Sequence, residues 1–154
     1  MVDDISNEEQ PETSNEDTAV MDSGAASVLG SRSRIYEYIK CLEKKGVNVD
    51  EDVEVFRCAK GFRYGNSQRE VSKHCCLLPV FIGGKKIKVM CYLIGGEAPI
   101  LVGRPMLEKL DLCVSYKNGQ VSYDDGATWQ DARRGPRGEF MVNLASTLQP
   151  AELG

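Results

Sequence analysis

Short apolar stretches separated by glycine-bearing turns recur along this chain, a pattern typical of a mainly β domain. Residues 77–82 are almost continuously apolar, Gly83 and Gly84 form a two-residue turn signal, and apolar and polar residues then alternate from 86 to 93. Such a sequence predicts a β-hairpin with one buried face. Residues 117–120 separate two further apolar stretches around an Asn-Gly pair, which predicts a second hairpin.

Four other segments have the composition of strands. Residues 18–21 enter a tight turn, and residues 27–30 leave it. Residues 100–102 are continuously apolar, as expected of a strand that is covered on both faces. A last strand is expected at 140–144.

The segment after residue 50 is harder to interpret. An acidic link at 50–54 leads into residues 53–64, where apolar positions alternate around Gly61 and Gly65. This alternation predicts two strands that bend back on each other at a glycine-bearing turn.

Two helices are expected, so the fold class is mainly β with one helix in the N-terminal half and one short C-terminal helix. The first covers residues 31–45, and either Ser31 or Ser33 is able to cap it. The second covers residues 105–110, where Pro105 suits the first turn. The apolar face of the longer helix comprises Ile35, Tyr38, Ile39 and Leu42.

Composition predicts one domain between two short tails. Apolar residues make up 42% and charged residues 27% of the 154 residues, as in ordinary globular domains. Residues 1–17 hold seven acidic and very few apolar side chains, so we expect a disordered acidic leader, followed by the domain at 18–145 and a C-terminal tail at 146–154. Removing the seven leader charges from the net charge of −4 leaves +3, which gives nucleic-acid binding little support.

Several classes of protein find no signal in the sequence. No stretch approaches the roughly 20 apolar residues that a membrane span needs, and the N-terminal residues do not resemble a secretory signal. We therefore expect a soluble, cytoplasmic protein without a membrane partner. The chain also has no phosphate-binding Gly-Lys-Ser/Thr loop and no dinucleotide fingerprint, which excludes nucleotide enzymes.

The cysteines and the single histidine do not predict a metal or disulfide framework. No two cysteines have the spacing of a zinc knuckle, so we expect small buried side chains or exposed free thiols, and no metal or cofactor. His74 adjoins Cys75, and neighbours on a strand face opposite sides, so they cannot form a catalytic dyad. His74 shares a face with Cys76, which leaves half of a zinc site as an alternative to a surface histidine. The cysteines are Cys41, Cys58, Cys75, Cys76, Cys91 and Cys113.

One tetrapeptide carries candidate catalytic chemistry. Asp22-Ser23-Gly24-Ala25 follows an apolar strand and resembles the active-site loop of retropepsins, the aspartic proteases of the retroviral type. Residues 98–107 (Ala-Pro-Ile-Leu-Val-Gly-Arg-Pro-Met-Leu) resemble the apolar strand, Gly-Arg pair and C-terminal helix of that family. Taken alone, Asp-Ser-Gly also describes an ordinary turn, so the order of the two motifs is what favours the catalytic interpretation.

Three further segments extend the resemblance over residues 19–144. Residues 62–66, together with 78–84, are similar to the flap and the following hairpin in protease domains of copia-type retrotransposon polyproteins. Residues 138–144 resemble the closing strand of those domains. The resemblance implies a closed β-barrel of the acid protease type, located in the cytoplasm or within a virus-like particle.

The implied activity is that of an aspartic endopeptidase that hydrolyses an extended polypeptide, such as a retroelement polyprotein. Peptide hydrolysis without a metal needs two carboxylates that share one proton, one acting as base while the other donates. Because the chain has one such loop, the resemblance implies a homodimer in which Asp22 of each subunit is catalytic. Ser23 would hydrogen-bond across the two-fold axis, Gly24 would let backbone pass close to the substrate, and Ala25 completes the active-site loop.

Other positions have supporting roles in this interpretation. Tyr64, Gly65 and Asn66 would form a flap that binds substrate and excludes water. Gly103 and Arg104 would support the dimer or the loop.

The sequence departs from the family pattern in three ways. Ala26 stands where retropepsins commonly have an acidic residue able to pair with the helix arginine, and Ser23 stands where many have threonine. The chain also has few residues ahead of the catalytic loop. A catalytically inactive retropepsin-like domain, used for dimerisation or partner binding, is therefore the alternative function.

Overall fold

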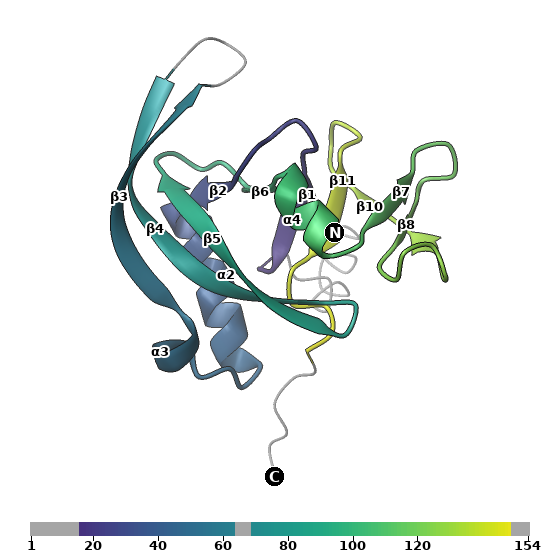
Figure 1. Ribbon diagram of the computed structural model, residues 1–154, viewed down its shortest axis with the longest axis horizontal. Coiled ribbons are helices and arrows are strands. Elements are labelled where there is room, and N and C mark those ends of the chain that lie inside the picture. The colour runs from purple at the N-terminus through teal and green to yellow at the C-terminus, as the bar shows by residue number, and fades with distance from the viewer. Residues whose placement is uncertain (1–15, 64–68, 149–154) are drawn as a thin grey trace, which may run out of the picture.

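The computed structural model describes residues 16–63 and 69–148, which fold into two β-sheets with helices against them (Figure 1). The smaller sheet consists, in spatial order, of β7 (Cys113–Ser115), β8 (Gln120–Ser122) and β9 (Gln130–Asp131). The larger sheet consists, in spatial order, of β10 (Arg133–Arg134), β11 (Phe140–Asn143), β1 (Thr18–Met21), β6 (Ile100–Val102), β2 (Val28–Ser31), β5 (Lys85–Ile94), β4 (Arg69–Ile82) and β3 (Glu54–Arg63).

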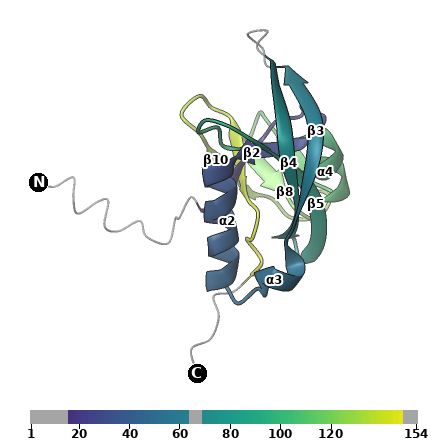
Figure 2. The ribbon, with the colours of Figure 1, turned by 90° about the vertical axis from the view of Figure 1, so that its left-hand side faces the viewer.

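Three helices accompany the sheets in the described ranges: α2 (Arg32–Lys44), α3 (Val49–Asp52) and α4 (Arg104–Lys109). Helix α2 lies along one face of the large sheet, where it contacts β2 and β5 (Figure 2). The expected mainly β fold with few helices is confirmed, and α3 adds a single turn within the acidic link. None of the described helices has the length and apolar character needed to cross a membrane.

The large sheet is open at both ends. Strands β10 and β3 occupy the two edges of the strand order, and within the described ranges they do not pair with each other. Closing a barrel requires these edges to meet, with a matching tilt and stagger of the strands. The expectation of a closed barrel is therefore not met by these strands, because β7, β8 and β9 pair among themselves instead of continuing the large sheet.

The hairpin of β4 and β5 confirms the strongest strand prediction. Its turn consists of Gly83 and Gly84, with φ values of 62° and 77°, between the paired residues Ile82 and Lys85. A two-residue turn with positive φ at both positions matches the twist of the flanking strands, and glycine adopts it without steric cost. A side chain at Gly83 would also collide with the carbonyl oxygen of Tyr123, at 2.7 Å from its Cβ.

Strand β3 differs from the prediction that residues 53–64 contain two strands bent back at a glycine-bearing turn. The strand runs through Gly61 without interruption and ends at Arg63, and a register shift between Arg57 and Lys60 takes up the irregularity. A bulge of this kind bends a strand and increases its twist while keeping it in the sheet. The turn expected at Gly65 lies outside the described residues.

Helix α2 begins at the first of the two candidate caps. The side chain of Ser31 accepts a hydrogen bond from the backbone nitrogen of Arg34, at 3.4 Å. After the helix, Gly46 has a φ of 92°, as is common where a helix is terminated. The predicted apolar face is confirmed, because Ile35, Tyr38 and Leu42 are buried in the core.

Asp17 belongs to the folded domain, although we expected it to be the last residue of the acidic leader. It is buried, and its carboxylate accepts hydrogen bonds from the side chain of Asn143 (2.9 Å) and the backbone nitrogen of Ala145 (3.2 Å). Its carbonyl oxygen accepts a third bond, from the backbone nitrogen of Leu144 at 2.7 Å. These bonds satisfy the buried polar atoms of Asp17 and hold the end of β11 and the residues after it against the start of β1.

All six cysteines are free thiols, four of them buried and two, Cys58 and Cys113, half-buried. Cys76 and Cys91 face each other across the β4–β5 ladder. Burial raises the pKa of Cys76 to about 12 and that of Cys91 well above its usual range. Both therefore stay protonated at neutral pH and act as small apolar side chains of the core.

Tyr38 of α2 connects the helix to the sheet, and removal of its hydroxyl group tests this packing. It is fully buried, and its hydroxyl donates to the carbonyl oxygens of Pro79 (2.6 Å) and Leu144 (3.4 Å).

Tyr38→Phe removes the donor and should lower the free energy of unfolding by about 1–2 kcal/mol in urea denaturation. Tyr36→Phe is the matched control, because Tyr36 is 61% exposed, and should change it by less than about 0.5 kcal/mol. Equal effects of the two substitutions would contradict this role of the Tyr38 hydroxyl.

Candidate active site

Asp22 is the first residue after β1, and backbone pairing fixes where it lies. Strand β1 runs parallel to β6, with Met21 opposite Val102, so both strands end at the same edge of the sheet. The backbone nitrogen of Asp22 extends this ladder by donating to the carbonyl oxygen of Val102, at 3.0 Å. The half-buried carboxylate of Asp22 accepts a hydrogen bond from the backbone nitrogen of Gly24, at 3.1 Å, which orients it within the loop.

Gly103 and Arg104 lie against the loop that carries Asp22. The backbone nitrogen of Arg104 donates to the carbonyl oxygen of Ala25, at 2.9 Å. A Cβ added to Gly103 would lie 2.6 Å from that oxygen and 2.8 Å from the carbonyl oxygen of Ser27. Only glycine lets the β6–α4 junction approach the loop this closely, since both contacts are with backbone that cannot rotate away.

The structure therefore brings together two motifs that are about 80 positions apart in the sequence. At the tip of the loop, Ser23 and Gly24 are exposed, and Ala25 is half-buried beside Arg104. The side chain of Arg104 makes no ion pair with any residue in the described ranges, and Ala26 is exposed. The expected flap residues Tyr64, Gly65 and Asn66 lie outside the described residues.

Two hollows meet at Asp22. The β3-side hollow, of about 460 Å³, separates Asp22 and residues 24–27 from residues 60–63 of β3. The α4-side hollow, of about 430 Å³, lies on the other side, and Ser23 and Arg104 line it with apolar side chains of α4 and the small sheet. Asp22 therefore borders a hollow on each side of its loop, unlike a side chain that is buried in the core.

The end of β3 that borders the β3-side hollow is anchored to its neighbours. The ring of Phe62 packs edge-on against the ring of Tyr92 on β5, with centroids 5.6 Å apart. On β4, the carboxylate of Glu70 accepts a hydrogen bond from the backbone nitrogen of Gly95, at 2.7 Å. These contacts hold the base of the β3–β4 hairpin over the Asp22 loop.

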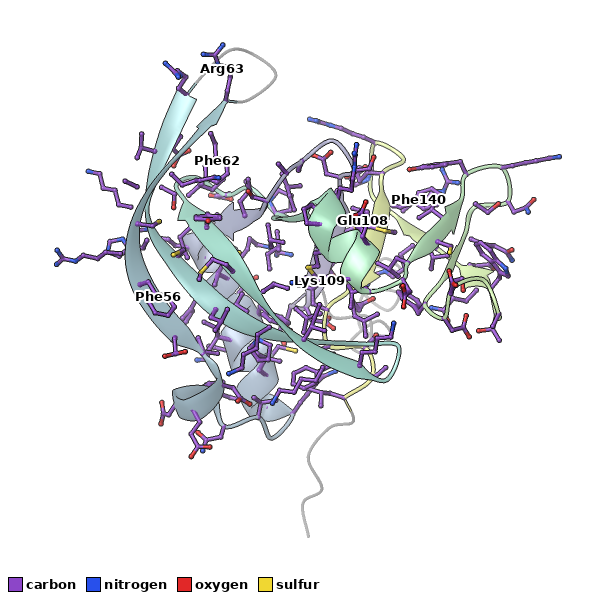
Figure 3. All side chains as sticks on the ribbon, in the orientation of Figure 1. Phe56, Phe62, Arg63, Glu108, Lys109 and Phe140 are labelled. Carbon is purple, nitrogen blue, oxygen red and sulfur yellow. The ribbon has the colours of Figure 1, made fainter. Side chains whose placement is uncertain are left out.

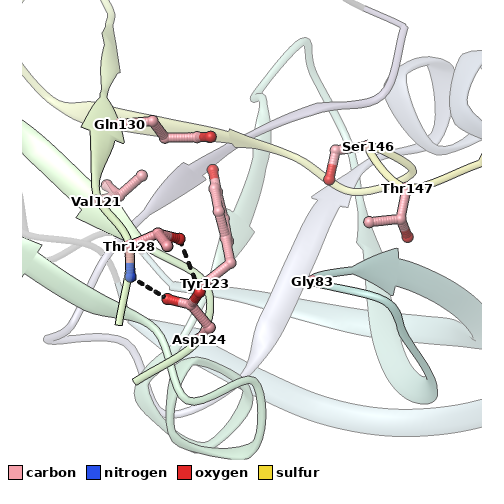
Figure 4. Close-up of a pocket in the computed structure, with 8 residues that line it drawn as sticks. All are labelled: Gly83, Val121, Tyr123, Asp124, Thr128, Gln130, Ser146 and Thr147. Atoms are coloured by element: carbon pink, nitrogen blue, oxygen red, sulfur yellow. Dashed lines mark hydrogen bonds between the residues drawn. The ribbon is translucent and has the colours of Figure 1, made fainter. Parts of the chain in front are cut away.

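A further hollow, of about 480 Å³, lies elsewhere, between the β4–β5 turn, the small sheet and the chain after β11 (Figure 4). Its one carboxylate, Asp124, accepts hydrogen bonds from the Thr128 backbone nitrogen (2.9 Å), the Thr128 hydroxyl (2.7 Å) and the Ser122 hydroxyl (2.7 Å). These bonds, that from Ser122 foremost, lower the pKa of Asp124 to about 2. The Asp124 carboxylate therefore stabilises the loop between Ser122 and Thr128.

His74 does not form part of a metal site in the described ranges. No group of three or more histidine, cysteine, aspartate and glutamate side chains there has an arrangement that could hold a metal ion. The Nδ1 atom of His74 is buried without a hydrogen-bond partner, although the residue as a whole is half-buried.

Comparisons with known proteins add a structural likeness. No protein-family model matches the chain, and no curated protein matches it. Among solved structures, the retroviral protease-like domain of Ddi1 from Leishmania major is similar, with a TM-score of 0.39 and 14% sequence identity over 70% of this chain and 84% of that one.

Adding one methyl group at residue 103 tests the close contact between Gly103 and the loop that carries Asp22. Gly103→Ala places that methyl against two backbone carbonyls, so the loop must shift, and the free energy of unfolding should fall by about 1–3 kcal/mol. Gly61→Ala is the control, because nothing lies within 4 Å of its added Cβ, and should change stability by less than about 0.5 kcal/mol. Urea denaturation measures both, and a Gly103→Ala protein as stable as Gly61→Ala would show that the close approach does not exist in solution.

Proposed function

We propose that this chain is one subunit of a homodimeric aspartic endopeptidase, in which Asp22 of each subunit supplies one of two catalytic carboxylates. The observation that carries the proposal is the placement of Asp22. Its backbone is fixed by β6, its carboxylate is oriented by the Gly24 nitrogen, and it borders a hollow that β3 covers. A preorganised carboxylate beside an open hollow is what activation of a water molecule requires.

Two carboxylates are needed for the chemistry. When they share one proton, the ionised member draws a proton from water while the protonated member donates to the carbonyl oxygen of the peptide. Asp22 is the one acidic residue that lines the β3-side hollow in the described part of the chain. Glu139 lines the α4-side hollow together with Asp22, but it accepts a hydrogen bond from the backbone nitrogen of Arg137 within its own turn.

A second copy of the chain is the proposed source of the second carboxylate. Ser23 and Gly24 are exposed at the tip of the loop, where the same residues of another subunit can approach about a two-fold axis. In that arrangement Ser23 hydrogen-bonds across the axis, and Gly103 and Arg104 hold each loop from behind.

The proposed substrate is an extended polypeptide. The β3-side hollow is a space between a loop and a strand, which suits a peptide that runs between them and hydrogen-bonds to backbone on either side. The resemblance of the sequence to copia-type proteases makes a retroelement polyprotein the proposed natural substrate, cleaved in the cytoplasm or in a virus-like particle.

A catalytically inactive domain used for dimerisation or partner binding is the second candidate. It is favoured by the exposed Ala26 and by the absence of an ion pair for Arg104 in the described ranges. Both candidates share the same loop geometry, so an activity measurement separates them.

Replacing the Asp22 carboxylate with an amide tests the mechanism. Asp22→Asn keeps an oxygen for the Gly24 nitrogen but removes the base, so cleavage should fall by ~100- to 10,000-fold while the dimer and its stability remain. Cleavage of a peptide library followed by mass spectrometry, together with sedimentation velocity, measures both.

Asp124→Asn is the matched control, because this second carboxylate lines the remote hollow in Figure 4 and should leave cleavage unchanged. Unaltered cleavage by Asp22→Asn would rule out the proposed mechanism. A wild-type dimer that cleaves no peptide would favour the inactive domain.

A further inference from the structure

The wall of the β3-side hollow opposite Asp22 is basic. Lys60 and Arg63 of β3 both line it, and both are exposed. Figure 3 shows Arg63 at the end of β3 remote from α3, with Phe62 beside it. Since Asp22 lies in the loop on the other side, the hollow has one acidic and one basic wall.

Within the described ranges, the two cations of this wall form no ion pair with a carboxylate. Every ion pair formed within the described ranges lies elsewhere, on α2, on the β4–β5 hairpin and in their surroundings, and none involves Lys60 or Arg63. The ammonium group of Lys60 instead lies 5.6 Å from the centre of the Tyr92 ring. The one acidic residue on this part of β4, Glu70, is bonded to the backbone of Gly95.

A third cation increases the positive potential. Arg69 stands directly opposite Arg63 in the β3–β4 ladder, and like charges in this position repel each other. Arg69 does not line the β3-side hollow itself, where an anionic group is attracted by Lys60 and Arg63. The exposed cations of the β3 wall raise the local concentration of anionic groups on that side of the hollow.

We propose that the β3-side hollow selects polypeptides that carry aspartate or glutamate close to the segment bound beside Asp22, with Lys60 and Arg63 as the residues that recognise them. The inference rests on the proposed function, because it assigns a substrate class to the same site. The negative charge of Asp22 repels an acidic side chain next to itself, so the preference applies to positions that flank the cleaved bond. In the proposed dimer each subunit contributes one basic wall, and the preference extends to both sides of that bond.

A binding measurement with the Asp22→Asn protein separates recognition from catalysis. The probes are a fluorescently labelled peptide of roughly ten residues with glutamate at alternate positions, and its counterpart with glutamine at the same positions. Fluorescence anisotropy should show the glutamate peptide binding ~3- to 10-fold more tightly at about 20 mM salt, with most of the difference lost at about 500 mM salt.

Variants of β3 identify the residues responsible. The double substitution Lys60→Gln and Arg63→Gln should remove the difference between the two peptides. Arg57→Gln is the matched control, since Arg57 is an exposed cation of the same strand that does not line the hollow, and should retain the difference. Circular dichroism of each variant verifies that the fold is kept.

The outcomes separate this inference from the proposed function. Equal affinity for the two peptides, a preference that survives in the double variant, or an equal loss in Arg57→Gln would each overturn the inference. Cleavage by the wild-type protein without any acidic preference removes this inference alone. Preferential binding of the glutamate peptide by a protein that cleaves nothing supports the inference and removes the proposed catalysis.

Discussion

The close packing of Gly103 against the backbone of the Asp22 loop is the constraint on which the candidate site depends. Parallel pairing of β1 with β6 brings both strand ends to one edge of the sheet, and the hydrogen bond from the Asp22 nitrogen to Val102 fixes where the chain turns. The bond from the Arg104 nitrogen to Ala25 then holds the far side of the loop. The direction of the Asp22 carboxylate therefore follows from backbone contacts, which do not depend on the rotamer of any neighbouring side chain.

Features determined by neighbouring residues could be predicted from the sequence. The Gly83–Gly84 turn specifies its hairpin because both positions need positive φ, and Ser31 caps α2 because its hydroxyl reaches the first turn. Features determined by distant residues could not. Burial of Asp17 depends on Asn143 and Ala145, more than 120 positions away, and no local pattern shows that β7, β8 and β9 form a separate sheet. Strands β9 and β10, of two residues each, are too short to have a hydrophobic period.

The candidate site also combines features that the sequence predicts with features that depend on distant residues. The resemblance predicts the Asp22 tetrapeptide as a site, and in the structure Gly103 and Arg104 lie beside its loop. The sequence does not predict the basic wall formed by Lys60 and Arg63. These residues follow Asp22 by about 40 positions, and only the folded position of β3 brings them to the same hollow. The Asp124 loop had no sequence signal beyond an Asp-Gly turn, yet its hydrogen bonds make it a closed structural unit.

The central claim is that one catalytic centre needs two copies of this chain. Titration calorimetry with a statine-type peptide, which imitates the tetrahedral intermediate between the two carboxylates, tests it most directly. In the proposed dimer, one molecule binds for every two chains and none binds to the Asp22→Asn protein, because the hydroxyl group of such a mimic occupies the position between the two aspartates. One molecule bound to each chain, or equal affinity for the Asp22→Asn protein, would contradict the claim.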